Sequence, residues 1–140
     1  MDPQTQRVYA AVKRAGDSIA PRVRRELESA YGPAWLVHVN TRLKADGKPL
    51  GRGLGDPRFV LSLVAHDRAL RAFDARQREA ARLLLGMSRS IAHYEPLTAS
   101  DVGRASELTT CLVGRDPGEA REAERAERAR ELRNRRNDVY

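Results

Sequence analysis

Arg89 and His93 are the two side chains whose types and spacing could do chemistry together. They lie four residues apart in the stretch 87–96, where a helix with apolar periodicity runs up to Pro96. Side chains four apart on a helix share a face, with about 5 to 6 Å between their Cβ atoms, so both could address one phosphate group. A helix C-terminus also favours Arg and His on electrostatic grounds alone. The spacing is therefore compatible with a phosphate-binding site and also with an ordinary helix C-terminus.

The elements that must position this pair belong to one small domain. The chain has 140 residues, of which 41% are hydrophobic and 32% are charged, enough for a limited core and at most one appendage. No run of about 18 or more apolar residues occurs, and Met1–Gln4 is not a basic segment that leads into an apolar stretch. We therefore expect no membrane span, no signal peptide and a cytoplasmic location.

Arginine supplies most of the positive charge. The net charge is +7, with 23 Arg and 3 Lys. This balance is compatible with a nucleic-acid partner, although a GC-rich genome also favours Ala and Arg. One Trp, two Phe and four Tyr are too few for a single-strand binder built on base stacking. The single cysteine, Cys111, lies in an apolar run without metal-ligating neighbours, so we expect no disulfide, no metal and no cofactor.

Apolar periodicity predicts an all-α fold. Apolar residues recur every three or four positions from Val8 to Tyr31, which predicts one long helix that could kink at Pro21. A short second helix is expected over 34–43. The segment from Lys44 to Gly55 holds four glycines and one proline and is the longest predicted loop.

Capping signals delimit the later helices. Asp56 followed by Pro57 opens a helix through 64, and Thr98–Asp101 resembles a capping box that opens a helix ending at 113. Between them, apolar steps of three and four predict a central helix from Asp67 to the residue before Pro96. These elements make a bundle of four to five helices. The charged residues of the central helix are expected on its outer surface: Asp74, Arg76, Arg78, Glu79 and Arg82.

The chain changes character after Gly114. From Gly118 to Asn137, Arg and Glu alternate with Ala, and Leu132 is the only large aliphatic residue. Surface ion pairs, and not a core, would support such a helix. We therefore expect a helical bundle over 1–114 and a charged helical tail or linker over 115–140 that leads to a further domain or effector protein.

Two stretches together resemble a known family. The first runs from Ile19 to Gly32, with Pro, Arg-Glu-Leu and Tyr-Gly in order, and Trp35 follows it. The second is Ser88–His93, followed by Glu-Pro-Leu and a capped helix. In this order and spacing, the chain resembles the Swt-type domains of the HEPN superfamily, whose second stretch reads Arg-Asn-x-x-Ala-His. The resemblance covers roughly residues 8–113.

The resemblance implies an RNA partner. HEPN domains are helical bundles that commonly form homodimers and often serve in bacterial defence or as toxins. Active members cleave RNA without a metal, with an Arg and a His at a shared cleft. The His could take the 2′-hydroxyl proton or protonate the leaving oxygen, while the Arg holds the phosphate. The 2′-hydroxyl also explains why RNA and not DNA would be the substrate.

The match fails at one catalytic position. Ala92 and His93 fall on the family's Ala-His, but Ser88 stands where the family has Arg, and Arg89 falls one residue later. On a helix this shift rotates the side chain by about 100°. A moved catalytic pair of Arg89 and His93 is one interpretation. Loss of activity is the simpler one, because Ser88 supplies no charge.

Three more residues are candidate RNA contacts. Arg22 and Arg25 lie beside the apolar stripe of the first helix and form either a solvated face or a phosphate track. Tyr94 could donate to a phosphate or simply close a helix. His66 is expected in a loop or junction, and His38 partly buried near the core.

Three functions follow from these interpretations. The favoured one is a HEPN-like RNA-binding or dimerisation module with weakened or lost nuclease activity. The second is an active metal-independent endoribonuclease that uses His93 and Arg89. The third is a protein-interaction adaptor that does not bind RNA. Salt-dependent affinity for RNA would count against the adaptor.

Overall fold

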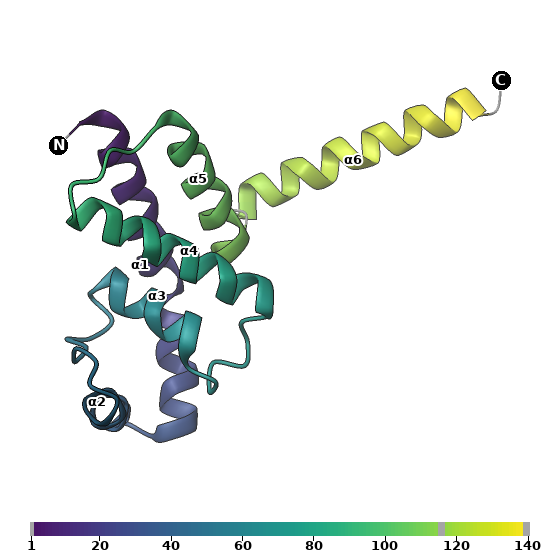
Figure 1. Ribbon diagram of the computed structural model, residues 1–140. Helices are drawn as coiled ribbons and strands as arrows, with labels where there is room; N and C mark the ends of the chain where they lie inside the picture. Colours follow the sequence, from purple (N-terminus) through teal and green to yellow (C-terminus); the bar gives the residue numbers. More distant parts are fainter. Residues whose placement is uncertain (1, 115–116, 139–140) are drawn as a thin grey trace.

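The computed structural model describes residues 2–114 and 117–138, and these residues form an all-helical fold without strands. Figure 1 shows the helices: α1 (Pro3–Tyr31), α2 (Trp35–Ala45), α3 (Pro57–His66), α4 (Ala75–Ala92), α5 (Ala99–Val113) and α6 (Pro117–Asp138). Six helices in the described ranges are one more than the upper bound of the predicted four to five. The sixth is the charged C-terminal segment.

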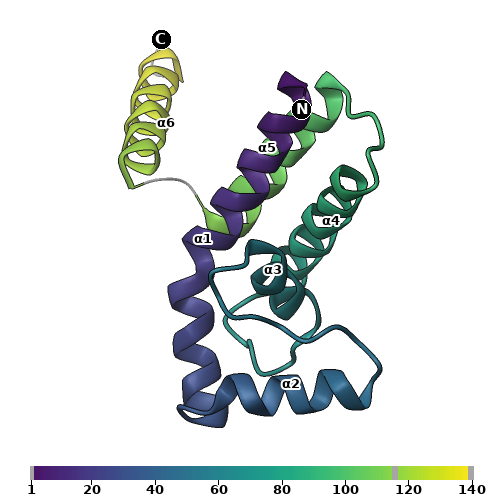
Figure 2. The same ribbon diagram turned by 90° about the vertical axis from the view of Figure 1, so that its left-hand side faces the viewer.

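Helix α1 carries the apolar stripe that the sequence predicts. Its buried residues recur at three and four: Val8, Val12, Ala15, Ile19, Val23 and Leu27. Asp2 caps the N-terminus of the helix, because its carboxylate accepts hydrogen bonds from the backbone N–H and the hydroxyl of Thr5. These bonds hold the pKa of Asp2 below its ordinary value. It bends midway (Figure 2) because Pro21 has no N–H for the carbonyl four residues earlier.

Helix α1 packs against several other helices of the bundle. The N-terminal half of α1 lies beside α5, while α3 packs against both α1 and α4 (Figures 1 and 2). Gly16 lies at the crossing of α1 and α3, where a Cβ atom would come within 2.6 Å of the Cα of Pro57. The crossing therefore requires a residue without a side chain. The largest fully buried side chains are those of Leu27, Leu61, Leu70, Leu84 and Leu112.

The predicted start of the central helix is wrong. Asp67 caps the C-terminus of α3, and α4 begins only after Asp74, which forms a capping box with Gln77. Leu70 and Phe73 are buried in the irregular connection 67–74. Their spacing imitates a helical period, but the chain turns back on itself between them. The other predicted capping box, over Thr98–Asp101, is confirmed.

Arg78 is not an outer-surface residue, which corrects the prediction for this position. Its guanidinium donates to four backbone carbonyls, those of Val64 at 3.0 Å, Asp67 at 2.8 Å, Leu70 at 2.6 Å and Phe73 at 3.3 Å. The helix end of α3 and the turn after it leave these carbonyl groups without helical partners. One side chain from α4 therefore fixes both the end of α3 and the connection that follows.

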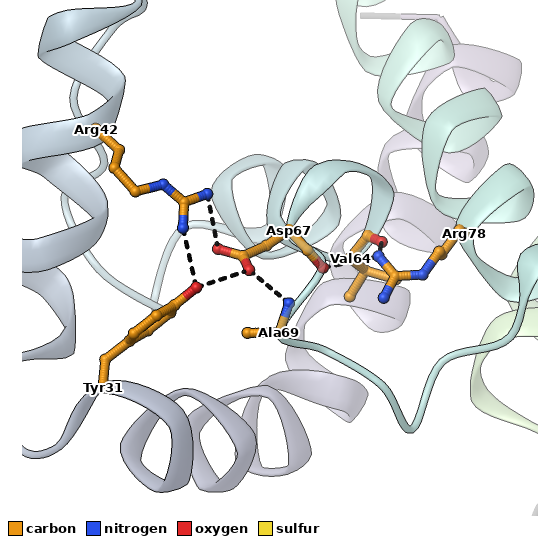
Figure 3. Close-up of polar contacts among 6 residues, drawn as sticks. All are labelled: Tyr31, Arg42, Val64, Asp67, Ala69 and Arg78. Carbon is orange, nitrogen blue, oxygen red and sulfur yellow. Dashed lines mark hydrogen bonds and ion pairs between the residues drawn. The ribbon is translucent and has the colours of Figure 1, made fainter.

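Asp67 joins three elements around that helix end (Figure 3). Its carboxylate is buried and accepts from the hydroxyl of Tyr31 at 3.3 Å and from the backbone N–H of Ala69 at 2.9 Å. Arg42 of α2 lies 3.6 Å from the same carboxylate and donates to the Tyr31 hydroxyl at 2.9 Å. His38, expected to be partly buried, is exposed and stacks on the Tyr31 ring. This network sets the position of His66, the residue just before Asp67.

Helix α6 stands apart from the bundle in both views (Figures 1 and 2), and its residues 125–135 are exposed. Leu132 has 61% of its surface exposed, so the helix lacks a buried apolar stripe over these residues, as its composition predicts. None of the helices in the described residues has both the length and the apolar character needed to cross a membrane. The cap that the sequence places at Asp116 lies outside the described residues.

Candidate anion-binding cleft

A cleft of about 450 Å³ opens between the loop 46–56, α3 and α4. One face of α3 forms its first wall, with Arg58, Ser62 and His66 at intervals of four residues. Four residues are slightly more than one helical turn, so these side chains follow one another along the cleft. His66 is the last residue of α3, directly before the anchored Asp67, so the wall ends at a fixed point.

Two further elements complete the cleft. Arg89 comes from the last turn of α4, and Lys48 comes from the loop. The floor is apolar, with the buried rings and chains of Phe59 and Leu85. Cations from three separate elements therefore face a common space above an apolar floor.

The loop that carries Lys48 is held at a defined place. The side-chain amide of Asn40 donates to the carbonyl of Gly51 at 3.0 Å and accepts from its N–H at 2.8 Å. A Cβ atom on Gly51 would lie 2.0 Å from the ring of Phe59, so the loop backbone packs directly on that ring. Leu54 adds a second, buried anchor. The predicted glycine-rich loop is confirmed as irregular, and it forms one wall of the cleft.

The lining of the cleft carries an excess of positive charge. Lys48, Arg58 and Arg89 bring three cations, while Asp56 is the only acid on the lining. Within residues 2–114 and 117–138, no ion pair or side-chain hydrogen bond engages any of the three cations. Arg82, on the same helix as Arg89, contrasts with them. Its bonds to Glu79 hold the pKa of that carboxyl below its ordinary value.

Arg89 and His93, the two residues that the sequence singles out first, have different surroundings. Arg89 is exposed and lines the cleft, together with His66 and not with His93. His93 is the C-terminal cap of α4, exposed, one helical turn beyond Arg89. Ser88, which the sequence resemblance aligns with an Arg of HEPN domains, is 7% exposed and faces the core. An Arg side chain at this position would therefore start in the core.

Tyr94 closes α4 in an unusual conformation. Its φ is 58°, in the left-handed region, and 94% of its surface is exposed. The N–H groups of Tyr94 and Glu95 bond to the carbonyls of Ile91 and Ser90, which is the Schellman arrangement that usually places glycine here. The ring is presented to solvent beside His93.

The two predicted arginine contacts on α1 differ from each other. The guanidinium of Arg22 donates to the carbonyl of Ala72 and lies 4.3 Å from the ring centre of Phe73, so it is engaged by the fold. Arg25 is exposed and lines a second, more open hollow with Arg24. Of the predicted phosphate contacts on this helix, Arg25 has the free side chain in the described structure.

Sequence reasoning missed the other members of the cleft. Lys48, Arg58 and His66 carried no recognised motif, and only the interval of four from Arg58 to His66 through Ser62 could have signalled a shared helix face. Their approach to Arg89 depends on packing between segments far apart in the chain. The described residues contain no group of three or more His, Cys, Asp and Glu side chains suited to a metal ion.

No protein-family model, curated protein or solved structure matches the chain.

Proposed function

We propose that the chain is a HEPN-like RNA-binding module, a dimerisation module, or both, whose nuclease activity is weakened or lost. It would act in the cytoplasm as part of a bacterial defence or toxin-type protein, with a further effector domain or protein beyond α6. The sequence resemblance over residues 8–113 and the all-helical fold support this proposal.

The observation that carries RNA binding is the position of Arg89. Its guanidinium lines a cleft with two further cations, Lys48 and Arg58, that have no acidic partner in the described residues. Arginine offers a planar fork of donors that matches phosphate oxygens. Arg22, Arg42 and Arg78, by contrast, are engaged by the fold itself. The free cations are therefore available to a polyanion.

Two positions favour binding over cleavage. Ser88 is buried where the family places its catalytic Arg, and it has no charge to stabilise a phosphate. His93 is exposed at the helix end and is absent from the lining of the cleft that holds Arg89. Misplacement of catalytic groups by about 1 Å can cost on the order of a hundredfold in rate. We therefore expect binding without efficient cleavage.

Fluorescence anisotropy with a labelled single-stranded RNA tests the binding. Arg89→Ala should weaken affinity about tenfold, because it removes one charge-assisted contact. Arg104→Ala is the matched control, since Arg104 is exposed on α5 and does not line the cleft. Equal affinity of all three proteins would contradict a role for Arg89. Absence of RNA binding would instead favour the adaptor function.

Incubation of the RNA with excess EDTA tests the nuclease alternative. The proposed module should leave the RNA intact. Products that end in a 2′,3′-cyclic phosphate, and that disappear with His93→Ala, would establish the active endoribonuclease and overturn this part of the proposal. Sedimentation of the same protein tests the homodimer, which predicts twice the mass of the single chain.

A further inference from the structure

We propose that the cleft binds a phosphomonoester of a ribonucleotide, and that it thereby recognises the phosphorylated end of an RNA strand. This inference rests on the proposed function, because it names the part of the RNA that the cleft takes. A terminal phosphate carries more negative charge than a phosphate inside a strand, and it has three free oxygens. The charge and the geometry of the cleft both suit such a group.

The first argument is charge. Lys48, Arg58 and Arg89 contribute three positive charges and Asp56 one negative charge, so the cleft holds a net charge of about +2. A phosphomonoester carries about −1.5 to −2 near pH 7, whereas each internal phosphodiester carries a single charge. The dianion therefore neutralises the cleft, while one diester leaves it about half compensated.

The second argument is convergence. The three cations come from the loop, from the first turn of α3 and from the last turn of α4, and they line one hollow. Arg24 and Arg25 differ, because both come from one turn of α1 and line their hollow together with the acid Asp17. Cations that converge from three elements suit a single group with three free oxygens.

The third argument is room for the attached nucleoside. The volume of about 450 Å³ lies within the range of small-molecule sites, and its floor of Phe59 and Leu85 is apolar. An adjoining hollow of about 140 Å³ shares Leu43, Lys48, Phe59, Ser62 and His66 with it, and its own lining includes Asp46 and Asp67. Leu50, 56% exposed, stands at the rim. A sugar and base can therefore rest on apolar surface while the phosphate meets the cations.

The start of α3 does not itself provide the site. Asp56 caps this helix, and its carboxylate accepts from the N–H of Arg58 at 3.0 Å. The positive end of the helix is therefore already occupied by an acid. Recognition rests on the side chains of Lys48, Arg58 and Arg89, and on the hydroxyl of Ser62 and the imidazole of His66 as further hydrogen-bonding groups.

Three forms of one labelled oligoribonucleotide test the inference with the full chain. One carries a 5′-phosphate, one a 3′-phosphate and one hydroxyl groups at both ends. We expect one phosphorylated form to bind about tenfold more tightly than the hydroxyl form. Adenosine 5′-monophosphate is the competitor that represents the free nucleotide. Displacement of the phosphorylated RNA by this competitor, and not by adenosine, supports the phosphomonoester as the group that is bound.

Substitutions locate the preference. Lys48→Ala and Arg58→Ala should each abolish the preference for phosphorylated RNA. Lys44→Ala and Arg68→Ala are the controls: they remove the same charge from exposed positions outside the cleft and should retain the preference. Asn40→Ala should reduce the preference by releasing the loop at Gly51, although Asn40 does not line the cleft. If Asn40→Ala lowers the preference for phosphorylated RNA but leaves the affinity for the hydroxyl form unchanged, Asn40 acts by positioning the loop.

The outcomes separate this inference from the proposed function. Equal affinity for the three RNA forms, with no displacement by the nucleotide, overturns the terminal-phosphate inference and leaves RNA binding intact. A preference that survives both Lys48→Ala and Arg58→Ala places the site elsewhere and also overturns it. Failure of all three RNAs to bind overturns the proposed function itself.

Discussion

The arginines of this protein divide by what their guanidinium groups contact. Arg22, Arg42 and Arg78 bond to backbone carbonyls or to side chains within the bundle. Arg58 and Arg89 instead line the cleft, without such partners in the residues that the structure describes. The sequence alone does not separate these groups. Arg78 has the spacing of an outer helix face, and only the folded connection 67–74 brings carbonyl groups to it.

Arg78→Met should destabilise the fold by about 3 kcal/mol. The substitution keeps the length of the side chain but leaves four partly buried carbonyl groups without their charged donor. Arg76→Met is the control, because Arg76 is exposed in the first turn of α4 and should change stability by less than about 0.5 kcal/mol. Urea unfolding measures both. Equal stability of the two variants would show that the carbonyl bonds contribute little.

Tyr94→Gly should stabilise the fold by about 1 kcal/mol. Tyr94 adopts a left-handed φ of 58° that glycine adopts without steric cost, and its exposed ring packs little against the bundle. The midpoint of urea unfolding should therefore rise. If Tyr94 also contacts RNA, the same variant should bind RNA more weakly. A lower midpoint would mean that the ring does stabilise the bundle by packing.

Capping residues predict helix boundaries correctly where no apolar period runs past the cap. Asp56 with Pro57, and Thr98 with Asp101, predict the starts of α3 and α5 correctly because a cap is a contact within one turn. The start of α4 is different. Leu70 and Phe73 continue the helical period although the chain between them is irregular, and burial in the core, not local propensity, sets their spacing. The capping box of Asp74 and Gln77 is the local signal that marks the true start of α4, although the apolar period begins earlier.

Gly16→Ala and Gly86→Ala should have opposite effects on stability. A Cβ on Gly16 would meet backbone and side-chain atoms of Pro57 at 2.6 Å, so α1 and α3 must move apart, at a cost of about 1 to 3 kcal/mol. Gly86, on α4, has nothing within 4 Å of such an atom, so alanine should stabilise that helix by about 1 kcal/mol. Thermal unfolding compares them. A stabilised Gly16→Ala variant would contradict the close crossing of α1 and α3.

At the scale of the whole molecule, the all-helical fold was predictable because periodicity and caps recur along the chain. The cleft was not. The sequence predicts that Arg89 could hold a phosphate, but its partners Lys48, Arg58 and His66 reach it through the packing of α3 on α4 and through the anchored loop. His93, the partner that spacing favoured, is on the same helix but outside the cleft lining. A site assembled by tertiary packing leaves little trace in local spacing.

The predicted division at residue 114 has consequences for stability. Residues 125–135 of α6 are exposed, so deletion of 115–140 should remove little apolar packing from the bundle. We expect the chain 1–114 to unfold in one transition, with a midpoint within about 2 °C of the full chain. Circular dichroism during heating measures it. Aggregation or early unfolding of the shortened chain would show that the tail belongs to the folded unit.

The salt dependence of RNA affinity tests the central claim most directly. Phosphate contacts release counterions, so the logarithm of the association constant should fall linearly with the logarithm of salt concentration. The combined variant Lys48→Ala, Arg58→Ala and Arg89→Ala should flatten the slope by about 1 to 1.4, because a terminal phosphate carries about 1.5 to 2 negative charges and each neutralised charge of a single strand adds about 0.7 to the slope. The same slope in wild type and variant, or an affinity that salt does not change, would contradict an RNA-binding cleft at α3 and α4.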